Sequence, residues 1–324
     1  MVHILNFFCD KVKLRGDFMF RTLLKSERGA VILLTALAMV VLCGLVGLAV
    51  DGGSLYITKA KLQNAVDAAA LAGSQALYEN AGLAKNIAEE YIEKNGFSKD
   101  SLTIDISEMA KSIRVEGEVD ITYTFMKILG FTQGVVKASA TAISGPLTSI
   151  DNGLRPLAIY DENLEYGKHY ILKYGADDGE TGNYGFIRLG DSGATQVAEN
   201  LKNGYNGKIK KGDSIQSETG NLSSNAIRKA INDLIDDCTH GCTYDNYQEG
   251  CSRLIAVPIF DPPAPAGAGY KEVKGFAMFM LDPINITSPY GHAEITGYFI
   301  EYTTSGDIDS SQTDSGLRGV KLTE

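Results

Sequence analysis

Tryptophan is absent from this chain of 324 residues, and only four histidines occur. The sequence contains no G-x-S-x-G, H-E-x-x-H or phosphate-binding loop motif, which excludes the common hydrolase, metalloprotease and nucleotide-binding patterns. The net charge of −10 also lacks the basic excess that nucleic-acid phosphates require. We therefore predict no catalytic residue, no cofactor and no nucleic-acid partner. The 35 glycines and the lack of tryptophan fit a β-rich, loop-rich protein.

Charge is also absent from the 22 residues 29–50, which read GAVILLTALAMVVLCGLVGLAV. An apolar stretch of this length can cross a bilayer as a helix. Residues 1–28 carry six basic and three acidic side chains, a net charge of +3, so the chain after the run carries −13. Basic residues near one end of a first helix keep that end in the cytoplasm. We predict a single-pass membrane protein with residues 1–28 in the cytoplasm and the acidic body outside.

A cleaved signal peptide is the competing interpretation of the apolar run. Gly47, Leu48 and Ala49 have the small-x-small form of a cleavage site. The run is nevertheless longer than the roughly 7–15 apolar residues of such signals, and a helical pattern continues beyond it. We therefore favour an uncleaved anchor over residues 29–50.

Alanines dominate the segment that follows the run. They recur at three- and four-residue steps, and alanine is the strongest helix former. We predict one helix from Gly29 to about Tyr78, roughly 75 Å long at 1.5 Å per residue, with Gly52 and Gly53 as a candidate kink. Its predicted packing face consists of Ala65, Ala68, Ala69, Ala72 and Ala76.

A second helix is predicted at residues 83–94, and alternating apolar residues then predict strands at 102–106, 113–125 and 136–142. The third strand has a small-residue face, Ala138 to Ala142, that matches the alanine face of the helix. We expect the two faces to pack together. Residues 51–145 would thus form a domain in which a long helix lies on a small antiparallel sheet.

Three strings carry a family resemblance. The first is Arg28-Gly29 at the start of the run. The second is Gly47-Leu48-Ala49-Val50-Asp51 at its end, and the third is LQNAVDAAALAG at residues 62–73. Together they resemble the N-terminal domain of TadG-like proteins of the Tad (Flp pilus) assembly system, densely over residues 28–78 and through the strands to Gly145. The resemblance implies a membrane-anchored, pilin-like accessory or minor component, with other Tad pilus assembly proteins or pilins as partners.

The sequence departs from this family pattern at two places. Pilin-type substrates of prepilin peptidase usually have Glu at the fifth mature position, and cleavage after Gly29 would place Leu34 there. We therefore expect Gly29 to remain uncut. Some TadG-like proteins carry a von Willebrand A domain with a D-x-S-x-S metal motif. The nearest string, residues 309–313, falls in a polar tail, and we interpret it as a solvated segment without metal.

Residues 154–303 form a second predicted region. Ser144-Gly145-Pro146 and Asp151-Asn152-Gly153 indicate a linker before it, and residues 304–324 are predicted to be a flexible tail. Six strands and two helices indicate an α+β fold with a substantial sheet. The strands are predicted at 157–160, 170–174, 184–189, 253–260, 273–281 and 294–302, and the helices at 195–202 and 223–236.

Several short strings here also resemble the C-terminal part of TadG-like proteins from Gram-positive lineages. We interpret the acidic loop 177–180 as a turn, because it lacks the ligand spacing of an EF-hand.

Three cysteines lie in the predicted exported body, where oxidation is possible. Cys238, Cys242 and Cys251 allow one disulfide with three possible pairings, and a bond to Cys251 would tie a helix to a strand. A metal site that includes His240 is disfavoured because the Cys-x-His-x-Cys spacing is unlike the common zinc patterns.

These observations predict a non-catalytic, membrane-anchored accessory or minor subunit of a Tad/Flp-type pilus. Its outer domain would face partners or the cell surface and serve assembly or adhesion. The alternative is a signal-anchored extracytoplasmic enzyme or ligand sensor whose site lies in residues 154–302. Clustered acidic and histidine side chains in a pocket there would favour the alternative.

Overall fold

The computed structural model describes residues 27–160, 164–173, 184–218, 225–262, 269–286, 294–304 and 306–323. The basic segment before Glu27 and the acidic loop 177–180 lie outside the described residues. The chain divides into two compact units, which are described separately. The first combines the chain up to Asn64 with Gly117–Ala138, and the second combines Ala65–Glu116 with Ser139–Glu324.

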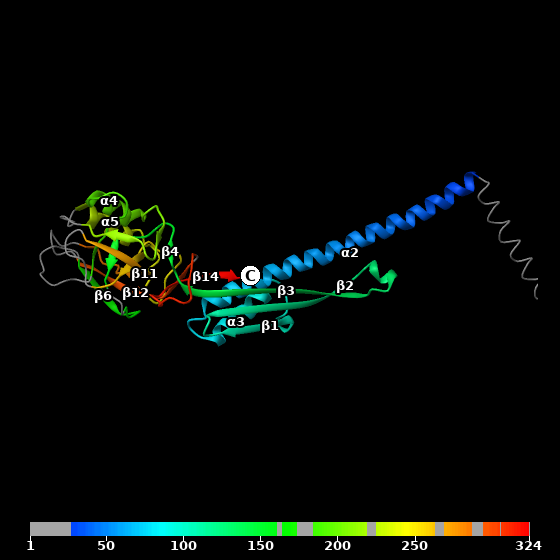
Figure 1. The fold of residues 1–324 in the computed structure, drawn as a ribbon, viewed down its shortest axis with the longest axis horizontal. Helices are drawn as coiled ribbons and strands as arrows, with labels where there is room; N and C mark the ends of the chain where they lie inside the picture. The colour runs from blue at the N-terminus through cyan, green and yellow to red at the C-terminus, as the bar shows by residue number, and fades with distance from the viewer. Residues whose placement is uncertain are drawn as a thin grey trace, which may run out of the picture. The chain divides into compact units, whose positions relative to one another are not determined.

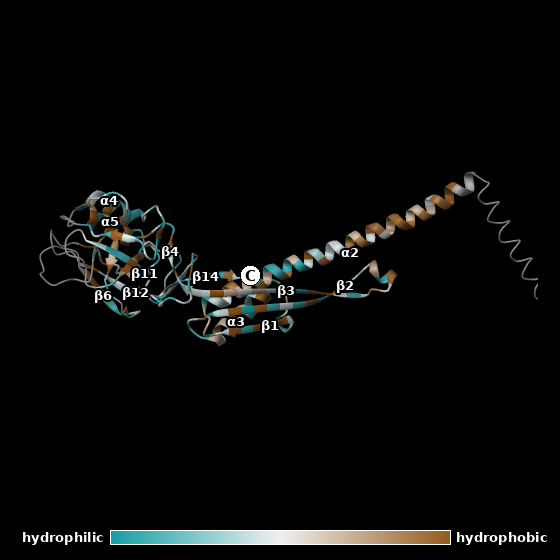
Figure 2. Cartoon of the chain, in the orientation of Figure 1, coloured by the Kyte–Doolittle hydropathy of each residue, from teal (hydrophilic) through white to brown (hydrophobic). Residues whose placement is uncertain are grey.

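The first unit contains most of helix α2, Glu27–Gln75, and the outer part of a hairpin (Figure 1). The hairpin strands are β2, Ser112–Thr122, and β3, Gln133–Pro146, with a short 3-10 turn at Met126–Leu129 between them. Helix α2 runs through Gly52 and Gly53 without interruption. Large apolar side chains of residues 31–50 are exposed along its length, and Figure 2 shows this part of α2 in brown. By length and composition, α2 can cross a membrane.

The second unit begins with the end of α2, which packs on helix α3 (Ala81–Lys94) and on strand β2. A Cβ atom built on Gly73 would lie 2.8 Å from both Ala84 O and Ile113 Cδ1, so α2 approaches its neighbours closely at this glycine. Asn80 caps α3 by accepting a hydrogen bond from Leu83 N at 2.6 Å. A 3-10 turn at Lys99–Ser101 leads into strand β1, Leu102–Ser107. The predicted fold class, a long apolar helix on an antiparallel sheet followed by a mixed α+β region, is confirmed.

The N-terminal sheet has five strands in the order β1-β2-β3-β14-β13, and its last two strands come from the C-terminal end of the sequence. Strand β14, Leu317–Thr323, pairs antiparallel with β3, while β13, Tyr302–Thr304, pairs parallel with β14.

The prediction of a flexible tail at 304–324 is therefore wrong for most of this segment. Leu317 is only 1% exposed, and Gly319 pairs with Gly145. Ser144-Gly145-Pro146, predicted to begin a linker, belongs to β3. The outer edge of β3 supplies backbone groups that β14 satisfies, and this partner lies too far along the chain for a local pattern to reveal it.

The C-terminal region contains a seven-stranded sheet in the order β6-β12-β11-β10-β5-β7, with β9 paired to β11. Helices α4, Ala194–Asn203, and α5, Asn225–Asp236, contribute their apolar faces to one buried cluster with this sheet. The remaining pair, β4 and β8, forms a separate two-stranded sheet. The strands are β4 (Ser149–Ile150), β5 (Leu157–Ile159), β6 (His169–Lys173), β7 (Tyr184–Phe186), β8 (Ile209–Lys210), β9 (Ser214–Gln216), β10 (Leu254–Phe260), β11 (Tyr270–Leu281) and β12 (Glu294–Ile300).

Arg318 of β14 connects three parts of the second unit. Its guanidinium lies 3.9 Å from the ring centroid of Tyr78, just beyond α2. Its Nη2 atom donates to Asp314 Oδ2 at 2.5 Å and also pairs with Glu301, which lies between β12 and β13. The C-terminal strand thereby joins the residue just beyond the end of α2 to the α+β region.

Candidate functional site

Asp51 immediately follows the uncharged run and is only 3% exposed. Its carboxylate accepts three backbone hydrogen bonds from the hairpin: Thr124 N and Phe125 N at 2.9 Å each, and Met126 N at 2.7 Å. Residues 123–132, which connect β2 to β3, are called the hairpin tip below. One side chain of α2 therefore holds three consecutive amides of the hairpin tip against the helix.

The electrostatics of Asp51 favour its charged form. Burial opposes ionisation, but the three amide donors, together with the charge of Lys127, outweigh it and hold the pKa of the carboxyl below its usual value. The carboxylate is therefore ionised at neutral pH. In that state it can only accept hydrogen bonds, which matches the three donors that face it.

Gly47 provides a second contact with the hairpin tip, one helical turn before Asp51. It is buried, and a Cβ atom built there would lie 2.7 Å from Phe125 Cβ. Any larger residue at position 47 would displace the Phe125 side chain. The sequence placed Gly47 in a possible cleavage motif and in a family string, but it did not reveal the contact of Asp51 with the hairpin. The available signals in the sequence were an acid directly after an apolar run and a strand connection without acidic residues.

The predicted alanine face is largely buried. Ala65, Ala69, Ala72 and Ala76 are buried, while Ala68 is half-buried. On β3, Ala140 is also buried. The pairing of these two faces stays a prediction that cross-linking can test.

The structure brings the three C-terminal cysteines together. The sulfur atoms of Cys238, Cys242 and Cys251 all lie within 4.8 Å of one another, and those of Cys238 and Cys251 are 3.4 Å apart as free thiols. Cys238 follows α5, and Cys251 precedes β10. His240, the fourth candidate metal ligand, is exposed.

The two closest thiols differ in acidity. Partial burial opposes ionisation of Cys238, but hydrogen bonds from Arg253 and Cys251 outweigh it and lower the pKa of the Cys238 thiol to about 6. Burial raises the pKa of the Cys251 thiol to about 12. The Cys238 thiol is thus the more acidic of these two, and the thiolate is the reactive form in disulfide chemistry. Three sulfur ligands could also hold a soft metal, although zinc generally takes four ligands.

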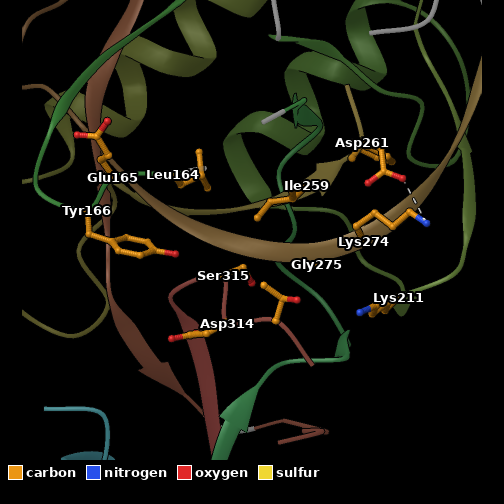
Figure 3. A pocket seen from close by; sticks show the side chains of 12 residues that line it. Leu164, Glu165, Tyr166, Lys211, Ile259, Asp261, Lys274, Gly275, Asp314 and Ser315 are labelled. Carbon is orange, nitrogen blue, oxygen red and sulfur yellow. Dashed lines mark ion pairs between the residues drawn. The ribbon is translucent and has the colours of Figure 1, made fainter. Parts of the chain in front are cut away.

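A pocket of about 700 Å³ opens in the C-terminal region (Figure 3). Lys274 Nζ lies 3.4 Å from Asp261 Oδ2 at its rim, while Ser315 Oγ donates to Phe276 O. The 12 residues that line it include no histidine and no cysteine. His169, the first residue of strand β6, lies elsewhere, with its Nε2 atom 2.6 Å from Asp282 Oδ2. Among the described residues, the lining therefore shows no cluster of acidic and histidine side chains of the kind that would favour an enzyme.

The geometry defines a class of protein: one apolar helix that extends far beyond the length of a membrane span, with a small antiparallel sheet packed on its alanine-rich part. A comparison with models of protein families assigns the N-terminal part of the chain to a narrower class. Residues 29–76 match the family described as Flp pilus-assembly TadE/G-like. The chain thus carries a TadE/G-like domain, which implies a protein of Tad pilus assembly that associates with other Tad components. No match to the chain was found among curated proteins or among solved structures.

Proposed function

We propose that this protein is a non-catalytic accessory or minor subunit of a Tad/Flp-type pilus, anchored by α2 and exposing its C-terminal region outside the cell for assembly or adhesion. One observation carries the proposal. The TadE/G-like domain begins with a helix that exposes large apolar side chains over residues 31–50 and buries small ones further on. Such a helix needs an apolar surrounding for its first part and a folded partner for its second part.

The charge distribution supports the orientation. The +3 charge before the run belongs on the cytoplasmic side, and the −13 charge after it belongs outside. The contact of Gly47 with Phe125 supports an uncleaved anchor, since cutting after Ala49 would remove Gly47 from the protein.

Deletion and complementation test the proposed role. Deleting the gene should abolish or strongly reduce piliation, and the full chain should restore it. A Lys274→Ala/Asp261→Ala double variant should restore piliation as well as the wild type, because the pocket has no part in the proposed role. Normal piliation without the gene would contradict the proposal. Binding or turnover that requires Lys274 and Asp261 would instead support the enzyme or sensor alternative.

Orientation has a separate test. Met109 lies in the turn between β1 and β2 and is 99% exposed. In intact cells, a membrane-impermeant thiol reagent should modify the Met109→Cys variant at this position.

Co-purification of the full chain from membranes with neighbouring pilus proteins would identify its partners.

The cysteine cluster fits a Cys238–Cys251 disulfide in the exported protein, with Cys242 as the remaining thiol. Formation of this bond transfers two electrons and two protons to an extracytoplasmic oxidant. Intact mass should rise by two hydrogen atoms on reduction. This change should persist in the Cys242→Ser variant and disappear in the Cys251→Ser variant. Retention of the mass change in Cys251→Ser would assign another pairing.

A further inference from the structure

The hairpin tip exposes apolar side chains that no described residue covers. Ile128 is 84% exposed, Leu129 72% and Phe131 57%. Residues 121–136 contain no acidic residue and one basic residue, Lys127, although the chain after the apolar run carries a charge of −13. Figure 2 shows brown at the end of this hairpin. A concentrated apolar surface on an otherwise acidic protein indicates a contact with something apolar.

The two contacts with α2 place the hairpin tip at the level of the membrane boundary. Residues 29–50 span about 33 Å as a helix, against roughly 30 Å for the hydrocarbon core, so nearly the whole run is needed to cross it. Gly47 therefore lies at or inside the edge of the hydrocarbon. Phe125 packs directly on Gly47, and Asp51 holds the adjacent amides one turn further along.

The backbone of the hairpin tip is suited to a water-poor environment, where an unpaired amide is costly. Asp51 accepts from three consecutive amides, those of residues 124–126. Carbonyls within the tip accept from four more, the amides of residues 123, 128, 130 and 131. Gly130 adopts a positive φ of 92°, which closes the turn. The tip thus satisfies these amides without water.

We propose that the hairpin tip is a second membrane-contacting element, with Ile128, Leu129 and Phe131 in the interfacial layer of the outer leaflet beside the anchor. The proposal rests on the proposed anchoring of α2. Lipid is the occupant because the apolar surface of the tip adjoins the exposed apolar surface of the run at Gly47. Lys127 fits a lipid phosphate at the same level. The hydrogen bonds of Asp51 to the amides of residues 124–126 hold the hairpin tip at this depth; this contact is called the tie below.

Fluorescence can test this placement directly, because the chain has no tryptophan and each introduced tryptophan is the only one. Three full-length variants are reconstituted into phosphatidylcholine vesicles with or without brominated acyl chains. Ile128→Trp probes the hairpin tip, Leu48→Trp is the control inside the run, and Met109→Trp is the control in solvent. The bromolipid should quench the Ile128→Trp emission nearly as strongly as that of Leu48→Trp, and should leave Met109→Trp unquenched. Leu129→Trp serves as a second probe of the tip should Ile128→Trp not fold.

The outcomes separate this inference from the anchoring itself. Quenching of Leu48→Trp without quenching of either tip variant overturns the lipid contact and leaves the anchor intact. Absence of quenching at Leu48 as well contradicts the anchor and the proposed function with it. Cross-linking between copies through Ile128→Cys, with no bromolipid quenching at the tip, would assign the surface to a second copy and overturn the proposal.

The tie is tested by adding Asp51→Asn to the Ile128→Trp variant. An amide has one acceptor oxygen in place of two and presents its own N–H donors to the backbone amides. Quenching at the tip should fall, while quenching of a Leu48→Trp/Asp51→Asn protein should stay unchanged. Equal quenching with and without Asp51 would contradict its role as the tie.

Discussion

Helix α2 contains two regions rich in apolar residues, which differ in the size of their side chains and in burial. Residues 31–50 are mainly large aliphatic residues, and their side chains are exposed. Six of the twelve residues 65–76 are alanines, and five of these six are buried. Large side chains on an exposed face need lipid, whereas alanines let another backbone approach closely. The comparison shows that, within this helix, burial follows side-chain size: the region of large side chains is exposed and the alanine-rich region is buried.

A charge in the first region should produce the largest effect. Val40 is exposed near the middle of the run, and arginine at the centre of a membrane helix costs about 2.5–3.5 kcal/mol on insertion. We expect Val40→Arg to deplete the protein from the membrane fraction. Ala60→Arg, which places the same charge on an exposed position beyond the run, should leave membrane association unchanged. Equal membrane recovery of the two variants would mean that the run is not a membrane span.

Replacing an alanine by leucine should lower stability in the alanine-rich region and leave it nearly unchanged in the apolar run. Ala69 is fully buried, so Ala69→Leu overpacks the helix–sheet contact and should lower the free energy of unfolding by about 1–3 kcal/mol. Ala36→Leu adds the same atoms to an exposed position in the run and should have almost no effect. Urea unfolding of the full chain in detergent, followed by circular dichroism, measures both. A stable Ala69→Leu protein would show that the alanine face is not tightly packed.

Glycine-to-alanine changes should give smaller effects of opposite sign. A Cβ at Gly73 would meet Ala84 O at 2.8 Å, so Gly73→Ala should destabilise the protein by about 1 kcal/mol after the gain in helix propensity. Nothing lies within 4 Å of a Cβ at Gly53, where alanine should stabilise the helix by about 0.8–1.0 kcal/mol. The same urea titration compares them, and a shift of the same sign for both variants would contradict the close approach at Gly73.

Cross-linking tests whether the alanine face of α2 packs on the small-residue face of β3. Ala69→Cys/Ala140→Cys should form a disulfide on mild oxidation, identified as a linked peptide pair by mass spectrometry. Ala69→Cys/Ser139→Cys is the matched control, since adjacent residues of a strand point to opposite faces of the sheet. A linked pair in the control alone would place the other face of β3 against the helix.

Much of the fold was predictable because the relevant patterns are local. The apolar run, the alanine spacing and the alternating residues at 102–106 each follow a local pattern, the predicted strand 253–260 is a short apolar run, and the structure has an element at each of them. The five-stranded sheet was predicted only in part. Its β14 strand is a short segment after a polar stretch, and its pairing with β3 joins residues such as Thr141 and Thr323 that no local pattern connects.

The candidate sites divide in the same way. The sequence alone predicted one disulfide among Cys238, Cys242 and Cys251, because these three thiols lie in the predicted exported body, where oxidation is possible. It did not predict the role of Asp51, whose hydrogen-bond partners lie 73–75 residues away. A single aspartate after an apolar run has no periodicity, and only the folded hairpin brings three amides to it.

By itself, the sequence determined the length of the apolar run, the charge difference across it and the small-residue face of the helix, because these depend on residue type and on spacing along one element. Only the tertiary structure decided which strand completes the sheet, which two thiols lie closest and what Asp51 binds. Those outcomes depend on backbone and side-chain groups that are distant in the chain and must be satisfied when water is removed.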